Sequence, residues 1–491
     1  MFRLLTLFRR SPLVIPSRTI STENILKRDV VAATHLDDLP TAKRFLGLVD
    51  LELTRHPMSK LHEFFYKRSK ELGEIYAFQP FFFSPKQLVI STPSLLAELS
   101  AKEGKNPDRG NSGFNIRRAM EMLGLKKGLV FSYGAEWKRL RDPLSKRLLR
   151  PKFISGYFPK LSEIAKCAVT DIIDIQGRGQ MNLDPIVERL RLWTVNSANY
   201  MAFHIFSSTE LTEETSEYFQ AMMSIVRGFG STKDIEWLSY FQRKKIRKLI
   251  ESLQTVINYN NKQIQVSATL PKDPDREQIT MLEYLQTETD FDEKEIINTF
   301  ISLLGAGVDT TTTSTQWLWY NLAKNLKVQE KLCEEVHSVI GDSSVVTAEH
   351  FNKLHYMKMC LKESMRVTPT VGTFTRILPE ESTIGGVCIP KDTQVFADIY
   401  GIGLNENYWR DPLEFIPERW ESRKEIDPFS FIPFGAGPRM CVGRRIAEAQ
   451  MQLITAHLCS SYKLHLVKEP DPKFEVLIKP EGLNLSFEKR V

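Results

Sequence analysis

The apolar residues of this chain recur mostly at helical spacing, and that periodicity predicts a protein built mainly of helices. Between residues 58 and 72, Leu61, Phe64, Phe65 and Leu72 follow this spacing, and Gly73 comes where a helix would end. The same pattern predicts further helices over residues 136–149, 157–176, 185–203, 210–228, 236–265, 293–326, 328–340, 353–366 and 444–462.

Short alternating segments predict a smaller β portion. Strands are expected over residues 75–78 and 87–91, across 370–400 with its Gly-Gly and Pro turns, and near the C-terminus. The polar, proline-broken stretch 268–279 is expected to be a surface loop. No Ser/Gly-rich linker and no internal repeat interrupts the chain, so the pattern predicts one large, mostly α domain with a minor β part, an α+β fold.

Composition places the chain among globular proteins and removes several functional classes. Of its 491 residues, 42% are hydrophobic and 26% are charged, which allows a large buried core. The formal net charge is +6, but Arg3, Arg9, Arg10 and Arg18 carry most of it. The remaining chain is nearly balanced, which argues against a nucleic-acid partner. The six cysteines form no Cys-x-x-Cys pair, which argues against a zinc ribbon.

The first 25 residues have the composition of a mitochondrial transit peptide, whose boundary is expected between residues 18 and 30. They bear Arg and hydroxyl residues and contain no acid before Glu23. A short disordered basic tail is the alternative. Arg3, Arg9 and Arg10 break the apolar run far short of the roughly 20 residues that a membrane anchor needs. The mature protein is therefore expected in the mitochondrial matrix, soluble or in peripheral, monotopic contact with the inner membrane.

The strongest chemical signal is the segment Phe-Gly-Ala-Gly-Pro-Arg-Met-Cys-Val-Gly at residues 434–443. Gly435 and Gly437 allow tight turns and a close approach to a flat ligand, and Arg439 can bind an acidic group on that ligand. Cys441 stands at the mouth of the helix predicted from about Gly443, where the helix dipole favours a thiolate. Such a thiolate suits a soft or borderline metal, and haem iron fits. A buried structural cysteine is the alternative.

The fixed positions Phe434, Gly437, Arg439, Cys441 and Gly443 make the segment resemble the haem-binding loop of the cytochrome P450 family. The resemblance extends over about residues 37–491 and implies one haem-thiolate monooxygenase domain. It implies a haem b cofactor, held by a loop that includes Phe434, Gly435 and Arg439. It also implies that Cys441 is the axial iron ligand, whose thiolate favours O–O cleavage.

Two further motifs match the family's structural core and its oxygen-side helix. Glu363 and Arg366 lie three apart on one helix face, and the resemblance joins them to Arg419 in a buried network that fixes the Cys441 loop. A solvated surface pair is the alternative. Asp309 and Thr310 follow two glycines inside an otherwise apolar helix, where hydroxyl side chains can bend the helix. The resemblance implies that Thr310 hydrogen-bonds the dioxygen and that Asp309 helps relay protons, whereas a satisfied polar kink is the alternative.

The remaining matches are cationic. Trp137 and Arg141 lie four apart on one helix, and the resemblance implies that they, with Arg376, bind the haem propionates. Lys358 and Lys362 share a helix face, and Arg444 and Arg445 directly follow the Cys441 loop. In the mitochondrial branch of the family, such cations dock an acidic [2Fe–2S] ferredoxin that an NADPH-dependent reductase reduces. For Trp137, Arg141 and Arg376 the alternative is a surface residue in a basic stretch, and for the docking cations it is solvated helix charge.

Together these features predict a mitochondrial haem-thiolate monooxygenase that inserts one oxygen atom of O2 into a lipophilic substrate, sterol-like or xenobiotic. A haem-thiolate isomerase or dehydratase and a haem-binding sensor are the alternatives, and the retained Asp309–Thr310 pair argues against them. The expected pocket is apolar. Its predicted lining includes Phe114, Phe219, Phe229, Val371 and Phe374.

Overall fold

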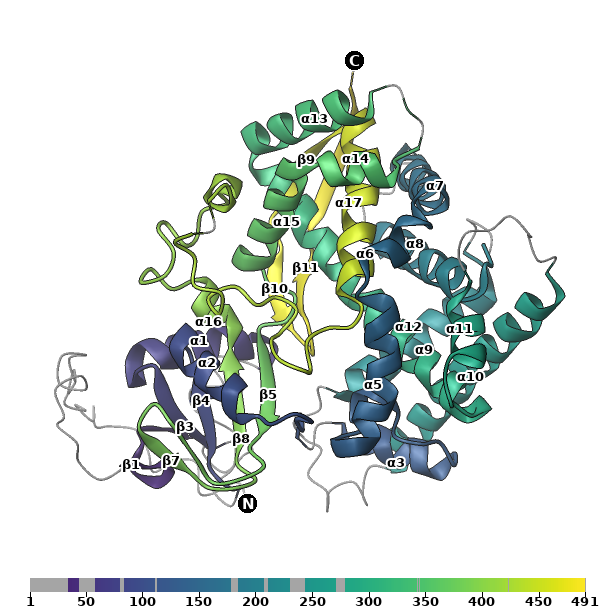
Figure 1. The fold of residues 1–491 in the computed structure, drawn as a ribbon. Coiled ribbons are helices and arrows are strands. Elements are labelled where there is room, and N and C mark those ends of the chain that lie inside the picture. Colours follow the sequence, from purple (N-terminus) through teal and green to yellow (C-terminus); the bar gives the residue numbers. More distant parts are fainter. Residues whose placement is uncertain are drawn as a thin grey trace, which may run out of the picture.

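The computed structural model describes residues 34–43, 58–79, 84–110, 113–177, 184–206, 211–229, 243–270, 279–341, 343, 345–422 and 424–490. The predicted transit peptide, residues 1–25, lies outside the described residues. Figure 1 shows a β-rich part, with α1, α2 and α16 against it, beside a larger helical part. The predicted fold class, mostly α with a smaller β portion, is confirmed.

The helices of the first half of the chain are α1 (Leu61–Leu72), α2 (Pro93–Lys102), α3 (Phe114–Met122), α4 (Gly128–Phe131), α5 (Gly134–Leu148), α6 (Pro151–Ser155), α7 (Phe158–Gly177), α8 (Asp184–Phe203) and α9 (Glu213–Phe229). Those of the second half are α10 (Arg243–Thr269), α11 (Met281–Thr287), α12 (Glu293–Lys324), α13 (Leu326–Ile340), α14 (Ala348–Lys353), α15 (His355–Val367), α16 (Ile399–Gly403) and α17 (Arg444–Ser461). Short 3-10 turns occupy Leu36–Asp38, Met58–Lys60 and Pro417–Trp420.

The strands form four small sheets. They are β1 (Thr34–His35), β2 (Thr41–Lys43), β3 (Ile75–Gln79), β4 (Gln87–Ile90), β5 (Thr373–Ile377), β6 (Ser382–Ile384), β7 (Val387–Ile389), β8 (Gln394–Asp398), β9 (Tyr462–Lys468), β10 (Asp471–Phe474), β11 (Ile478–Glu481) and β12 (Asn484–Lys489). The largest sheet has the order β2-β3-β4-β8-β5, in which β4 and β8 run parallel. The order of the second is β1-β7-β6, and β9–β12 and β10–β11 are antiparallel pairs.

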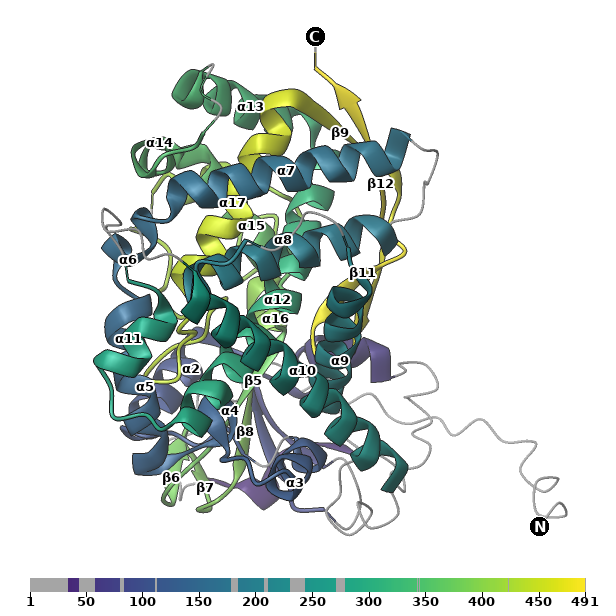
Figure 2. The ribbon, with the colours of Figure 1, turned by 90° about the vertical axis from the view of Figure 1, so that its right-hand side faces the viewer.

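Helix α12 runs through the middle of the helical part and belongs to two apolar cores. Phe300 and Leu304 pack in a core with α5, α7, α8, α13, α15 and α17, while Ile301 and Val308 pack with α3, α8, α9 and α10. Figure 2 shows α7 and α8 lying side by side, with α12 beneath them. A capping box starts α12, because Asp292 accepts from the Glu295 N–H and Glu295 accepts from the Asp292 N–H. Because two of its faces are buried, α12 holds the residues in its middle, including Asp309 and Thr310, in fixed positions.

The predicted helices are largely where the periodicity places them, and their ends differ by a few residues. The prediction 293–326 corresponds to α12, and the prediction 236–265 to α10, although residues 236–242 lie outside the described part. The predicted loop 268–279 begins later than expected, because α10 includes residues 268 and 269 and residues 271–278 are not described. The pattern missed α2, although Thr92 caps it and Pro93 occupies its first turn, two ordinary helix-start signals.

Candidate functional site

The loop that carries Cys441 is folded by its own backbone. The Cys441 N–H donates to the Phe434 carbonyl at 2.9 Å, which closes the loop at both ends. Gly435 and Gly437 have φ of +75° and +68°, a region that residues with a Cβ adopt at a cost. Gly443 then caps α17, so the helix begins directly after the loop. Sequence and structure agree that Cys441 sits at a helix N-terminus.

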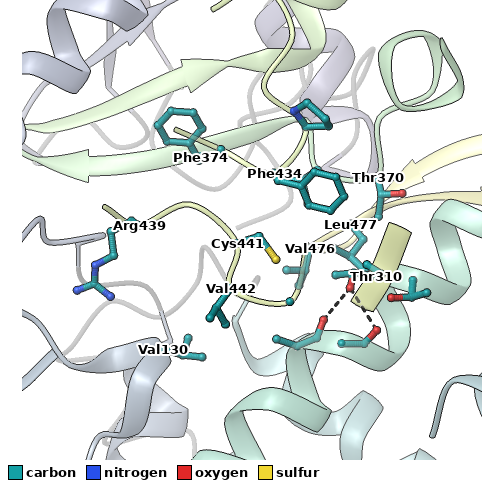
Figure 3. A pocket seen from close by; sticks show the side chains of 18 of the residues that line it. Val130, Thr310, Thr370, Phe374, Phe434, Arg439, Cys441, Val442, Val476 and Leu477 are labelled. Carbon is teal, nitrogen blue, oxygen red and sulfur yellow. Dashed lines mark hydrogen bonds between the residues drawn. The ribbon is translucent and has the colours of Figure 1, made fainter. Parts of the chain in front are cut away.

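The Cys441 side chain faces a large internal cavity of about 860 Å³, which it lines together with Thr310 of α12. Figure 3 shows Cys441 and Thr310 on different walls, with Phe434, Val476 and Leu477 nearby. Burial raises the pKa of the Cys441 thiol, while the Gly443 N–H, Arg109 and Arg141 act to lower it. The helix terminus alone therefore does not produce the thiolate that the sequence predicts. A metal ion at the sulfur would, because coordination deprotonates a thiol.

Four arginines converge beside the Cys441 loop, and three of them are predicted site residues. Arg439 donates to the carbonyls of Pro107 and Ser132, and its guanidinium lies 4.1 Å from the centre of the Trp137 ring. Arg141 donates to the Met440 carbonyl at 2.5 Å, and Arg376 lines the same cavity. The structure thus brings Trp137, Arg141, Arg376 and Arg439 together, as the resemblance implies.

The fourth cation, Arg109, was not predicted, because it lies in a loop without a recognisable motif. It donates to the Arg439 carbonyl at 3.1 Å and lines the cavity. Burial and the charge of Arg376 lower the pKa of Arg109 to about 10. Burial and the charges of Arg109 and Arg376 lower the pKa of Arg439 to about 9. Four crowded cations of this kind favour an anionic ligand.

One buried acid, Glu103, lies against this arginine group and was also missed by the sequence. Its carboxylate pairs with Arg376, and burial raises the pKa of Glu103. A single carboxylate leaves most of the positive charge uncompensated. The buried Nη1 atom of Arg439 has no hydrogen-bond partner within the described residues. Two propionates, a flat ring beside Gly435 and an iron at Cys441 would complement these groups, so the residues present fit haem.

The predicted network around Glu363 is assembled, with Glu363 and Arg366 fully buried and Arg419 partly exposed. Glu363 accepts from Arg366 at 2.7 and 3.0 Å, from Arg419 at 2.8 Å and from the Trp420 indole at 2.9 Å. Arg366 also donates to the carbonyls of Gly403, Pro412 and Glu414. Every charged end has several partners, so a solvated surface pair is excluded for Glu363 and Arg366. The network ties α15 to the segment 403–420, which leads into the Cys441 loop.

The middle of α12 places Thr310 and Asp309 on different sides of the helix. Thr310 lines the cavity, and its hydroxyl donates to the Ala306 carbonyl at 2.7 Å. Asp309 is 2% exposed and does not line the cavity; it pairs with Arg191 at 3.4 Å and with Lys479 at 2.8 Å. The helix continues through this region as α-helix. The two residues are adjacent in sequence, but only the hydroxyl faces the space beside Cys441.

Much of the cavity wall is apolar, as expected. Val371 and Phe374 line the cavity, with Val476 and Leu477 from the β10–β11 turn. Figure 3 shows Phe374, Val476 and Leu477 around Cys441. Phe219, however, packs in the core of α3, α8, α9 and α10. The side chains of Phe114 and Phe229 lie outside the described residues.

The four predicted partner-binding cations lie on α15 and α17, which contact each other. Lys358 donates to the Asn352 carbonyl, and burial lowers its pKa. Arg444 and Arg445 both pair with Glu448, at 2.9 and 3.8 Å. The Glu448 carboxylate also acts on Lys358, which places these three cations around one acid. Lys362 lies 5.6 Å from the Trp420 ring. Sequence reasoning missed Glu448, which offsets part of this positive surface.

Comparison with known proteins agrees with this geometry. The family model described as "Cytochrome P450" matches residues 41–487. The chain is 28% identical over 437 residues to the 1,25-dihydroxyvitamin D(3) 24-hydroxylase, mitochondrial, of Mus musculus, covering 87% of this chain and 83% of that protein. It is 28% identical over 400 residues to the Sterol 26-hydroxylase, mitochondrial, of the same species, covering 77% and 74%. It is also 28% identical over 456 residues to Cytochrome P450 10 of Lymnaea stagnalis, covering 88% and 81%.

Proposed function

The chain belongs to the cytochrome P450 family and is a haem-dependent monooxygenase of its mitochondrial branch, and from this premise we propose that it hydroxylates a lipophilic substrate with electrons from a [2Fe–2S] ferredoxin. The substrate is sterol-like or a xenobiotic of similar character. The observation that carries the proposal is the single cavity with Cys441 and Thr310 on its walls and four arginines at its edge.

The chain's own residues have distinct roles in this reaction. Bound haem supplies the binding and activation of dioxygen. Cys441 holds the iron and donates electron density through its thiolate. Arg109, Arg141, Arg376 and Arg439, with Trp137, orient the ring through its carboxylates. The Thr310 hydroxyl can turn from the Ala306 carbonyl into the cavity, where it holds a proton next to the reacting oxygen.

The substrate class follows from the cavity wall and from the relatives. Val371, Phe374, Val476 and Leu477 favour burial of an extended apolar molecule and offer no charged partner to it. Two relatives are named as hydroxylases of a sterol and of a dihydroxyvitamin D(3). An isomerase or dehydratase of this kind uses neither O2 nor external electrons and so needs no proton delivered to bound dioxygen; the cavity-facing Thr310 therefore speaks against those alternatives.

The decisive experiment reconstitutes the purified protein with reduced ferredoxin, its NADPH-dependent reductase and a panel of sterols, secosteroids, fatty acids and lipophilic drugs. We expect a spectral shift of the ferric protein with some of them, and an oxygenated product that consumes NADPH. The ferrous–CO adduct should absorb at the long wavelength of thiolate ligation, and Cys441→His should lose that band. Normal turnover by Cys441→Ser, or a product formed without NADPH and O2, would refute the proposal.

The proposed ferredoxin site is the surface formed by Lys358, Lys362, Arg444 and Arg445. An acidic partner would be attracted to these cations, with an attraction that weakens as salt rises. Reversing both lysines to Glu should slow ferredoxin-dependent reduction strongly and flatten its salt dependence, while haem content stays unchanged. Glu448→Gln is the matched opposite change, because it removes the carboxylate that pairs with Arg444 and Arg445. It should tighten ferredoxin binding. Ferredoxin affinity within about twofold of the original in both variants would place the docking site elsewhere.

The proposed location is the mitochondrial matrix, after removal of a transit peptide that ends between residues 18 and 30. Within the described residues, no helix is both long and apolar enough to cross a bilayer. Peripheral contact with the inner membrane is part of the proposal. A fusion of residues 1–35 to a fluorescent protein should be imported into mitochondria, and diffuse cytosolic fluorescence would contradict this.

A further inference from the structure

The β10–β11 hairpin touches both the cavity and the acid of α12. Val476 and Leu477, at its turn, line the cavity. Two residues further on, Lys479 reaches Asp309 on the side of α12 that does not face the cavity. The hairpin therefore contacts both the cavity, through Val476 and Leu477, and the Asp309 carboxylate, through Lys479. Asp309 is the acid to which the family resemblance assigns the proton relay.

The backbone of β11 is fixed firmly enough to make this contact specific. The Ile478 carbonyl accepts from the Trp317 indole of α12 at 2.8 Å, and the Ile478 N–H donates to the Thr370 carbonyl at 2.8 Å. Lys479 follows directly, so its side chain starts from an anchored position. The contacts of the turn before it are longer: the Glu475 N–H donates to the Leu477 carbonyl at 3.2 Å, and the Glu475 carboxylate accepts from Arg227 of α9 at 3.4 Å.

Two cations hold Asp309, but through charge more than through hydrogen bonds. Lys479 Nζ lies 2.8 Å from Asp309 Oδ2, although this oxygen makes no hydrogen bond within the described residues. Arg191 of α8 approaches the other oxygen at only 3.4 Å. Lys479 also lies 3.9 Å from Glu475 at the turn, so a second carboxylate competes for its charge. A small shift of the turn would redistribute Lys479 between the two acids.

We propose that Lys479 is a positioning residue that couples the Asp309 carboxylate to the cavity-lining turn of the β10–β11 hairpin, so that a molecule packed against Val476 and Leu477 changes the hold on that carboxylate. This proposal rests on the proposed function and adds to it a way for an occupied cavity to prepare the proton relay. Asp309 lies off the cavity wall that carries Thr310, and the coupling would strengthen proton delivery when a molecule packs against the hairpin.

The test compares Lys479→Met with Lys473→Met in the haem-loaded protein. Lys473 and Lys479 are direct cross-strand partners, so they lie on the same face of the hairpin and carry the same charge. The structure records no ion pair between Lys473 and Asp309. The control variant therefore removes a neighbouring charge without touching the proposed contact.

The first readout is hydrogen–deuterium exchange and involves no turnover. Clotrimazole, a bulky lipophilic imidazole, is compared with imidazole itself, which has the same iron-binding ring but no apolar groups to extend toward the hairpin. We expect clotrimazole alone to change exchange in residues 474–479 and in α12 around 306–312, in the wild type and in Lys473→Met. In Lys479→Met the α12 response should become smaller while the hairpin response stays; it should not vanish, because Ala306, Gly307 and Thr310 line the cavity and still contact the ligand. An unchanged α12 response in Lys479→Met would overturn the proposal.

The second readout is product formed per electron pair with a turned-over substrate. Lys479→Met should lower it about 2- to 30-fold, the usual range for a residue that couples two sites. Lys479→Arg should restore most of it, and Lys473→Met should match the wild type. Equal losses in both Met variants would show a general charge effect and refute the coupling. If Lys479→Met fails to hold haem, Lys479→Gln replaces it under the same criteria. A wild-type protein that never consumes reduced ferredoxin would defeat the proposed function, while the exchange data still decide on Lys479.

Discussion

Two buried acids of this protein, Glu363 on α15 and Asp309 on α12, are held in opposite ways. Glu363 accepts four side-chain hydrogen bonds from Arg366, Arg419 and Trp420, all between 2.7 and 3.0 Å. Asp309 has two cations, one at 3.4 Å and one that makes no hydrogen bond to it. A carboxylate with saturated partners is part of the scaffold, whereas one with poor partners can change them at little cost. The segment that leads into the Cys441 loop is thus held rigidly through Glu363. The Asp309 carboxylate on α12, by contrast, can change its partners.

A third acid, Asp398, completes the comparison because it has no ion pair in the described part of the chain. It is fully buried at the end of β8, where one oxygen accepts from the Gly401 N–H at 2.9 Å. Burial raises its pKa to about 7, and the single backbone bond offsets only part of that rise. The three acids therefore show three solutions to burial: several partners, loose partners, and a shifted proton equilibrium.

The largest effect is expected from Glu363→Gln, which breaks the saturated cluster. Arg366 and Arg419 would then be buried without a counterion, a change that costs about 3–5 kcal/mol. Urea unfolding of the purified protein, with haem content measured alongside, should show both a lower midpoint and a loss of bound haem. A variant that keeps its haem and unfolds like the wild type would mean that Glu363 is dispensable for the Cys441 loop.

The next effect is expected in catalysis rather than in stability. Asp309→Asn and Thr310→Ala should each keep haem and lipophile binding, because neither change disturbs the hydrogen-bonded network around Glu363. Product per NADPH should fall by about 10²-fold or more, since a positioned proton donor contributes at least that much. Electrons should appear in peroxide or water, which a peroxide assay measures. Unchanged coupling in Thr310→Ala would show that this hydroxyl only completes the helix.

The smallest effect concerns Asp398, and it separates burial from ion pairing. Its folded pKa is raised, so its contribution to stability is present at low pH and is lost as pH rises from about 4 to 7. Between pH 6 and pH 8 the wild type should lose on the order of 1 kcal/mol of unfolding free energy through this group. Asp398→Asn keeps an oxygen for the Gly401 N–H and should lack that loss. If the unfolding free energies of the wild type and Asp398→Asn changed equally between pH 6 and pH 8, the raised pKa of Asp398 would be contradicted.

The sequence predicts local contacts well and long-range ones poorly. The spacing of Glu363 and Arg366 already implies contact on one helix face, and the glycines around Cys441 already imply a tight loop. Arg419 needed the family resemblance, since it reaches Glu363 from a separate segment. Arg109, Glu103 and Glu448 carry no motif, and only folding brings them to the site. Lys479 and Asp309 meet for the same reason, because no local pattern records a pairing between a C-terminal hairpin and a central helix.

The parallel pairing of β4 with β8 has a consequence for how this protein folds during its synthesis. Leu88 lies beside Val395, so the main sheet unites segments from opposite ends of the polypeptide. During synthesis, β3 and β4 emerge long before the strand that completes them, and one edge stays exposed in the interim. Such distant pairing makes folding slow and favours aggregation of the incomplete chain. A nascent chain truncated before residue 394 should therefore depend on chaperones, because β4 lacks its partner strand until β8 has been made.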